Sequence, residues 1–155
     1  MKKVLGIVFI LLMAMAVIRC STSKTQTASK SQSSASPIEG TWEMISNYNY
    51  DEGEVTDTVP LQDGYRQIKM FYDGKVMWTR YVPTDSVEWF GYGTYITTDT
   101  TLTEVLEYMS ASMRRIANAN MEWNMKLEMG KDRYSQIFID GEGNPISSEN
   151  YKRID

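Results

Sequence analysis

One nine-residue segment constrains the fold of this chain more than any other feature. From Met121 to Met129, apolar side chains occupy every second position and polar side chains fill the gaps. Successive side chains of a β-strand point to opposite faces of the sheet, so this period of two predicts a strand with one buried and one solvated face. The segment therefore favours a fold built on a β-sheet.

Turn signals divide the neighbouring sequence into further strands. Asp73 and Gly74 separate two strand-like runs, residues 65–72 and 75–82, and an Asp-Gly pair in this position is typical of a tight hairpin. Pro83 ends the second run, because proline has no N–H to donate to a sheet. The composition predicts five more strands, over residues 40–50, 89–97, 101–109, 133–139 and 149–154.

The segment from residue 101 to residue 119 admits two interpretations. Its apolar residues fit helical spacing from 102 to 117, and Thr101 with Glu104 could form a capping box. Its first half is also rich in β-branched residues, so we predict a strand over 101–109 and then a short helix or loop over 110–119. The chain is thus expected to be all-β, with eight strands in an antiparallel up-and-down β-barrel. A barrel of this size either holds one small ligand or fills its interior with side chains.

The N-terminal part of the chain has the composition of an export signal and a linker. Lys2 and Lys3 precede an uncharged apolar run over residues 4–18, which is 15 residues long. A membrane span needs roughly 17–25 residues, so this run predicts a secretory signal peptide, with a permanent signal anchor as the alternative. Ten of the sixteen residues from 21 to 36 are Ser or Thr, which is typical of a disordered tether. The predicted division is a signal peptide over 1–20, a linker over 21–36 and a barrel domain over 37–155.

Composition excludes several function classes. The chain has no histidine and one cysteine, which rules out a Ser-His-Asp triad, a Cys-His pair, a His-ligated zinc site and an intrachain disulfide. Residues 37–155 contain all 20 acidic residues and 11 of the 16 basic ones, a formal charge of −9 that argues against nucleic acid as a partner. We expect no enzyme activity, cofactor or metal. Glu104 and Glu107 should face opposite ways on a strand, and two acidic clusters are interpreted as a solvated loop and a hairpin turn: Asp51, Glu52, Glu54 and Asp57, and Asp140, Glu142 and Asn144.

Short motifs near both ends of the barrel domain resemble a known family. Gly40-Thr41-Trp42 resembles the G-x-W signature of lipocalins, and the segment Glu149 to Arg153 resembles the closing strand of small bacterial lipocalin-like lipoproteins. The resemblance implies a structural barrel base made by Gly40, Trp42 and Arg153, with the arginine packed across the indole ring. The alternative for Arg153 is a solvated charge near the end of the last strand.

The sequence Val17 to Cys20 resembles a bacterial lipobox, in which the cysteine becomes the first residue of the mature protein and carries acyl chains. Arg19 stands where that pattern has a small residue, so a free Cys20 after an uncleaved anchor is the alternative. Either way we expect an exported domain in the cell envelope. Lipidation at Cys20 would anchor it to a membrane, on the periplasmic or outer-membrane side.

Methionines and aromatic residues dominate the expected barrel interior. Methionine adapts to irregular shapes and is common on apolar binding surfaces. We therefore predict a membrane-tethered protein that binds a small apolar or amphipathic ligand. One alternative is a filled barrel that binds a protein partner through residues 51–63 or 110–119, and another is an enzyme with two buried acids in one pocket. The predicted ligand-binding residues are Met44, Trp78, Tyr95, Trp123, Met125 and Phe138.

Overall fold

The computed structural model describes residues 36–155, so the predicted signal peptide, Cys20 and nearly all of the linker lie outside the described residues. Within this range the chain is almost entirely β-sheet, with a single short helix. The elements are β1 Gly40–Asp51, β2 Glu54–Val59, β3 Arg66–Tyr72, β4 Lys75–Tyr81, β5 Trp89–Thr97, β6 Thr101–Met109, α2 Ala111–Ala117, β7 Glu122–Met129, β8 Arg133–Ile139 and β9 Pro145–Arg153.

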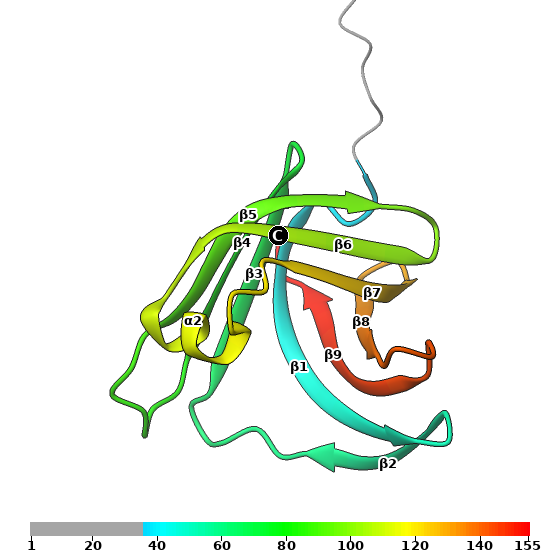
Figure 1. Ribbon diagram of the computed structural model, residues 1–155, viewed down its shortest axis with the longest axis horizontal. Helices are drawn as coiled ribbons and strands as arrows, with labels where there is room; N and C mark the ends of the chain where they lie inside the picture. Colours follow the sequence, from blue (N-terminus) through cyan, green and yellow to red (C-terminus); the bar gives the residue numbers. More distant parts are fainter. Residues whose placement is uncertain (1–35) are drawn as a thin grey trace, which may run out of the picture. The chain divides into compact units, whose positions relative to one another are not determined.

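Eight of the strands close into an antiparallel barrel, which confirms the predicted fold class. From β3 to β9 each strand pairs with the next along the sequence, and β1 pairs with both β3 and β9. The closing register runs from Trp42 opposite Arg153 to Asn49 opposite Ser147, and Figure 1 shows β1 and β9 side by side. Closure gives the barrel strands partners on both sides, which removes the exposed edges of an open sheet.

Among the elements of residues 36–155, strand β2 is the one that the sequence interpretation missed. Residues 54–59 were expected within an acidic loop, but they turn back after Gly53 and pair with the second half of β1, with Asn47 opposite Val59. The first half of β1 pairs instead with β3, from Gly40 opposite Phe71 to Glu43 opposite Ile68. All six residues of β2 are exposed, so this strand has no buried face and its sequence shows no alternation of apolar and polar residues.

The sheet contains the predicted hairpin at Asp73 and Gly74 and a shift of register between β5 and β6. Asp73 and Gly74 have φ of 46° and 72°, as a tight hairpin between β3 and β4 requires. The register of β5 against β6 shifts between Tyr92 and Gly93, an irregularity in a strand that contains two glycines.

The ambiguous segment divides as predicted. Thr101 and Glu104 both lie in β6, so they form no capping box. The helix α2 begins after Ser110, whose hydroxyl accepts a hydrogen bond from the backbone N–H of Met113 at 3.2 Å. A serine in this position satisfies one of the N–H groups that the first turn leaves without a partner.

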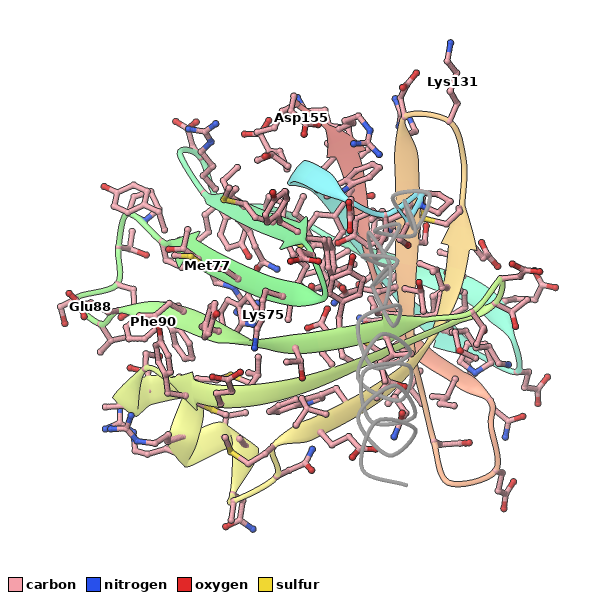
Figure 2. The ribbon with its side chains drawn as sticks, turned by 90° about the horizontal axis from the view of Figure 1, so that it is seen from above. Lys75, Met77, Glu88, Phe90, Lys131 and Asp155 are labelled. Atoms are coloured by element: carbon pink, nitrogen blue, oxygen red, sulfur yellow. The ribbon has the colours of Figure 1, made fainter. Side chains whose placement is uncertain are left out.

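The two ends of the barrel differ. The helix α2 and the β4–β5 connection lie together at the open end, where the Ser110 backbone N–H donates to the Phe90 carbonyl at 3.0 Å. In Figure 2, Glu88 and Phe90 mark this end and Lys131 marks the opposite end, which is called the base below. Within residues 36–155 no helix is long and apolar enough to cross a membrane.

Candidate functional site

The base of the barrel is built around Trp42, which is fully buried. Its Nε1 donates to the carbonyl of Ile38 at 2.7 Å. The guanidinium of Arg153 lies over the indole with its Cζ 4.1 Å from the ring centroid, a cation–π arrangement. The same guanidinium donates to the carbonyls of Glu39 at 2.7 Å and Pro37 at 2.9 Å. Arg153 is therefore held between the ring and the segment that precedes β1.

Gly40 makes room for this arginine. Its φ is 137°, in a region that residues with a side chain rarely adopt. A Cβ built at this position would overlap Nη1 of Arg153 and approach the Asp155 carboxylate. The structure thus brings together Gly40, Trp42 and Arg153, the three residues that the sequence resemblance assigned to the base.

Aromatic rings continue inward from the base. Trp42 meets Tyr134 edge to face at 4.8 Å between ring centroids, and Tyr134 stacks on Tyr151 at 4.7 Å. Phe71 and Tyr95 pack against each other at 4.9 Å. Burial raises the pKa of Tyr134 and Tyr151 well above the ordinary value, because a phenolate would lose its hydration. Within residues 36–155, the Tyr134 hydroxyl is the single fully buried side-chain oxygen or nitrogen without a hydrogen-bond partner.

Buried charged and amide side chains lie further inside the barrel, beyond the aromatic rings. The ammonium of Lys69 donates to Oε1 of Glu104 at 2.7 Å and to Oε1 of Gln136 at 2.8 Å. All three residues are less than 5% exposed. The Lys69–Glu104 pair is almost completely shielded from water. An unpaired charge would be very costly in so buried a place, so each member of the pair depends on the other.

The carboxylate of Glu149 is the second centre of this network. Its Oε2 accepts from Gln136 at 2.9 Å, from Gln67 at 3.0 Å and from the hydroxyl of Tyr151 at 2.6 Å. Arg80 donates to Oε1 of Gln67 at 2.7 Å and approaches Oε1 of Glu149 at 3.4 Å. Two cations, two carboxylates and two amides thus form one connected polar group inside the barrel.

A cavity of about 90 Å³ lies between this polar group and an apolar wall. The wall is formed by side chains from β4, β6, α2, β7 and β8, and the cavity is partly open to solvent. On β5, a Cβ at Gly91 would overlap the Trp78 indole, so this glycine leaves room for that ring. The lining residues are Gln67, Lys69, Trp78, Arg80, Glu104, Leu106, Met113, Trp123, Met125, Gln136, Phe138 and Glu149.

Four of the six predicted ligand-binding residues line this cavity: Trp78, Trp123, Met125 and Phe138. The other two lie elsewhere. Met44 lines a groove at the open end of the barrel, together with Tyr65, Trp89 and residues 59–62, and this groove is called the mouth groove below. Tyr95 packs on Phe71 among the aromatic residues near the base, away from the cavity wall.

The sequence interpretation missed the polar half of the cavity, although a signal for part of it was available. Gln136 lies two residues before Phe138 on β8, and Arg80 lies two residues after Trp78 on β4. Residues two apart on a strand share a face. Extending the face of Phe138 and Trp78 by one step would have placed Gln136 and Arg80 in the interior.

Arg80 lies between the cavity and the mouth groove, which has a volume of about 300 Å³. Its Cζ is 6.0 Å from the ring centroid of Tyr65 and 5.8 Å from that of Trp89. Trp89 is fixed in turn by a hydrogen bond from its Nε1 to the Asp85 carboxylate at 2.7 Å. Burial raises the pKa of Tyr65 to about 12, with the charge of nearby Arg80 opposing part of this rise.

The two acidic clusters lie on the surface, the first across the hairpin of β1 and β2 and not in a loop, the second in the turn between β8 and β9. Among residues 36–155, no three acidic, cysteine or histidine side chains come together as metal ligands would. The Asp140 carboxylate accepts from the backbone N–H groups of Glu142 at 2.9 Å and Asn144 at 2.8 Å, and these hydrogen bonds lower its pKa. Glu104 points into the barrel and Glu107 lies exposed on the outer face, where it pairs with Lys75 at 2.9 Å.

Comparisons with known proteins place this chain in no family. No family model matches the sequence, and no curated protein matches it. Among solved structures, an uncharacterised protein from Bacteroides eggerthii is similar, with a TM-score of 0.47 and 16% sequence identity. The likeness covers 75% of this chain and 98% of that one.

Proposed function

We propose that this chain is a lipocalin-like binding protein that holds a small amphipathic molecule inside its barrel. One observation carries the proposal, namely the partly open interior cavity with opposed polar and apolar walls. Ligand sites are typically concave and mostly apolar, with a few polar groups that orient the ligand. The cavity has this composition, and it is built on strands whose partners on both sides fix their positions.

Binding without catalysis fits the chemistry of the cavity better than catalysis does. Two buried carboxylates, Glu104 and Glu149, do line it, as an acid–base enzyme would need. Each carboxylate is committed to a cation, however: Glu104 to Lys69 at 2.7 Å and Glu149 to Arg80 at 3.4 Å. They therefore act as structural charges that orient a ligand.

A pair of variants tests the binding proposal. Met113 on α2 lines the cavity, whereas Met77 is about half exposed on the outer face of β4. Native mass spectrometry of the purified full-length protein should show a bound small molecule in the wild type and in Met77→Trp. Met113→Trp should lose it, because the larger side chain fills the cavity. A wild-type protein that neither retains a small molecule nor takes one up would refute the proposal.

The proposal extends to location. Lys2 and Lys3 and the apolar run over residues 4–18 support export. The position of Cys20 close behind this run supports attachment to a membrane through acyl chains on the cysteine, although Arg19 departs from the lipobox pattern. Mass spectrometry of the membrane fraction is the test. A mature protein that begins at acylated Cys20 is expected, and an unmodified Cys20 still preceded by Arg19 would contradict the lipid anchor.

A second candidate function, binding of a protein partner, rests on β2. In the described part of the chain this strand pairs with β1 alone, and all six of its residues are exposed. A free strand edge can accept an extended segment of another protein. A photo-crosslinking residue at Val55, which is 50% exposed, should capture a discrete protein in intact cells, whereas one at Met70, which is 48% exposed on β3, should not. Equal adducts from both positions would argue against this role.

A further inference from the structure

We propose that the cavity selects a molecule of single-ring size whose polar end carries no net charge, either a neutral group such as an amide or a zwitterion. This inference rests on the proposed function, because it specifies the ligand of the same site. Three properties of the cavity lead to it: the balance of its charges, the unused hydrogen-bonding capacity of its polar wall, and its volume.

The charges that line the cavity cancel. Its cations are Lys69 and Arg80, and its anions are Glu104 and Glu149. Lys69 and Glu104 have side chains only 4% and 5% exposed, so little water is available to screen an additional charge. A ligand with a net charge would have to displace one member of a pair or remain uncompensated, and both are costly in a buried site. A neutral or zwitterionic ligand avoids this penalty.

The polar wall can both donate and accept. The ammonium of Lys69 has three N–H donors, and two of them are used by Glu104 and Gln136. Among the described residues, Glu104 accepts only through Oε1, so its second oxygen remains available. A ligand group that accepts a hydrogen bond from Lys69 and donates one to Glu104 would use the remaining hydrogen-bonding capacity of both side chains. An amide has this pair of functions, whereas a carboxylate only accepts and an ammonium only donates.

The volume limits the size of the ligand. An enclosed apolar cavity of about 150 Å³ takes up benzene. This cavity has a volume of about 90 Å³ and is partly open to solvent, so it holds no more than one substituted ring and is too small for a long acyl chain. Trp78, Trp123 and Phe138 offer aromatic surfaces to such a ring, and Met125 adds a thioether.

Calorimetry with four probes tests the inference on the purified full-length protein. The probes are benzamide, benzoate, benzylamine and laurate, so the first three share a ring and differ mainly in charge. We expect benzamide to bind and the two charged analogues to bind at least about tenfold more weakly. Laurate should not compete with benzamide for the cavity.

A single substitution then shifts the charge balance. Glu104→Gln makes the lining positive by one charge, so benzoate should gain at least about tenfold relative to benzamide. The matched control is Glu107→Gln on the same strand, where the side chain is exposed and should leave the preference unchanged. Should Glu104→Gln fail to fold by circular dichroism, Arg80→Gln serves instead, because its side chain is 31% exposed; benzylamine should then gain.

The outcomes separate the two proposals. Tighter binding of benzoate or benzylamine than of benzamide to the wild type would overturn the charge inference and leave the proposed function standing. An unchanged preference in the charge variant would do the same. Tight competition by laurate would overturn the size limit. Absence of binding by every probe would overturn this inference, and loss of the molecule from native spectra as well would overturn the proposed function.

Discussion

The fit between Gly40 and Arg153 makes a quantitative prediction about stability. Replacing Gly40 by alanine forces a Cβ into a backbone with φ of 137°, which costs about 1–3 kcal/mol. The same Cβ overlaps the Arg153 guanidinium and must push it away from Trp42. Loss of that cation–π contact adds about 1–2 kcal/mol. Gly40→Ala should therefore lower the free energy of unfolding by about 2–5 kcal/mol.

Urea unfolding followed by tryptophan fluorescence measures this change. The control is Gly141→Ala, because a Cβ at Gly141 meets no atom within 4 Å. A double-mutant cycle with Arg153→Met isolates the overlap from the backbone strain. With methionine at 153, Gly40→Ala should cost the backbone strain and a small shift of the Asp155 carboxylate, but no cation–π contact, so the two changes should be less than additive by about 1–2 kcal/mol. Equal costs for Gly40→Ala and Gly141→Ala, or full additivity in the cycle, would refute the reasoning.

Three further predictions concern the interior and the helix. Lys69→Met should lower the free energy of unfolding in urea by about 3–5 kcal/mol, because it leaves Glu104 as a buried charge without a partner. The double variant Lys69→Met/Glu104→Leu should recover most of that loss, and a small cost of the single variant would contradict the buried pair. Tyr134 and Tyr151 are neutral in the folded protein, and burial raises their pKa values. Their contribution to the free energy of unfolding is therefore full below about pH 10, and it falls above that pH by about 1.4 kcal/mol per pH unit for each tyrosine. Tyrosinate absorbance at 295 nm should therefore appear for these two only on unfolding. Ser110→Ala should cost about 1 kcal/mol and speed hydrogen exchange in α2, and unchanged exchange would argue against the cap.

The sequence predicts the barrel strands well because most of them have one buried apolar face. In β7, Met125 and Leu127 are almost fully buried while Glu122 and Lys126 are exposed, as the alternation requires. The hairpin at Asp73 is equally predictable, since its turn chemistry is local. In both places a short stretch of sequence carries all the information needed.

Strand β3 shows why the polar half of the cavity was harder to foresee. Its buried residues are Gln67, Lys69 and Phe71, whereas Met70 and Tyr72 are 48% and 77% exposed. Hydrophobicity by itself would orient this strand the other way. The polar face is inside because partners on β6, β8 and β9 satisfy it, and those partners lie 35 to 84 residues away in sequence. A pairing at that distance leaves no local pattern.

The pairing of β1 with β9 has a consequence for how the protein folds. Trp42 and Arg153 face each other across this seam, although more than a hundred residues separate them along the chain. Contacts of this kind form late, because the entropy of closing so long a loop has to be overcome first. Because a chain is synthesised from its N-terminus, β1 would have to wait for β9 with one side unpaired. Folding should accordingly be slow. The chain should be most prone to aggregate, or to bind a chaperone, before β9 has paired with β1.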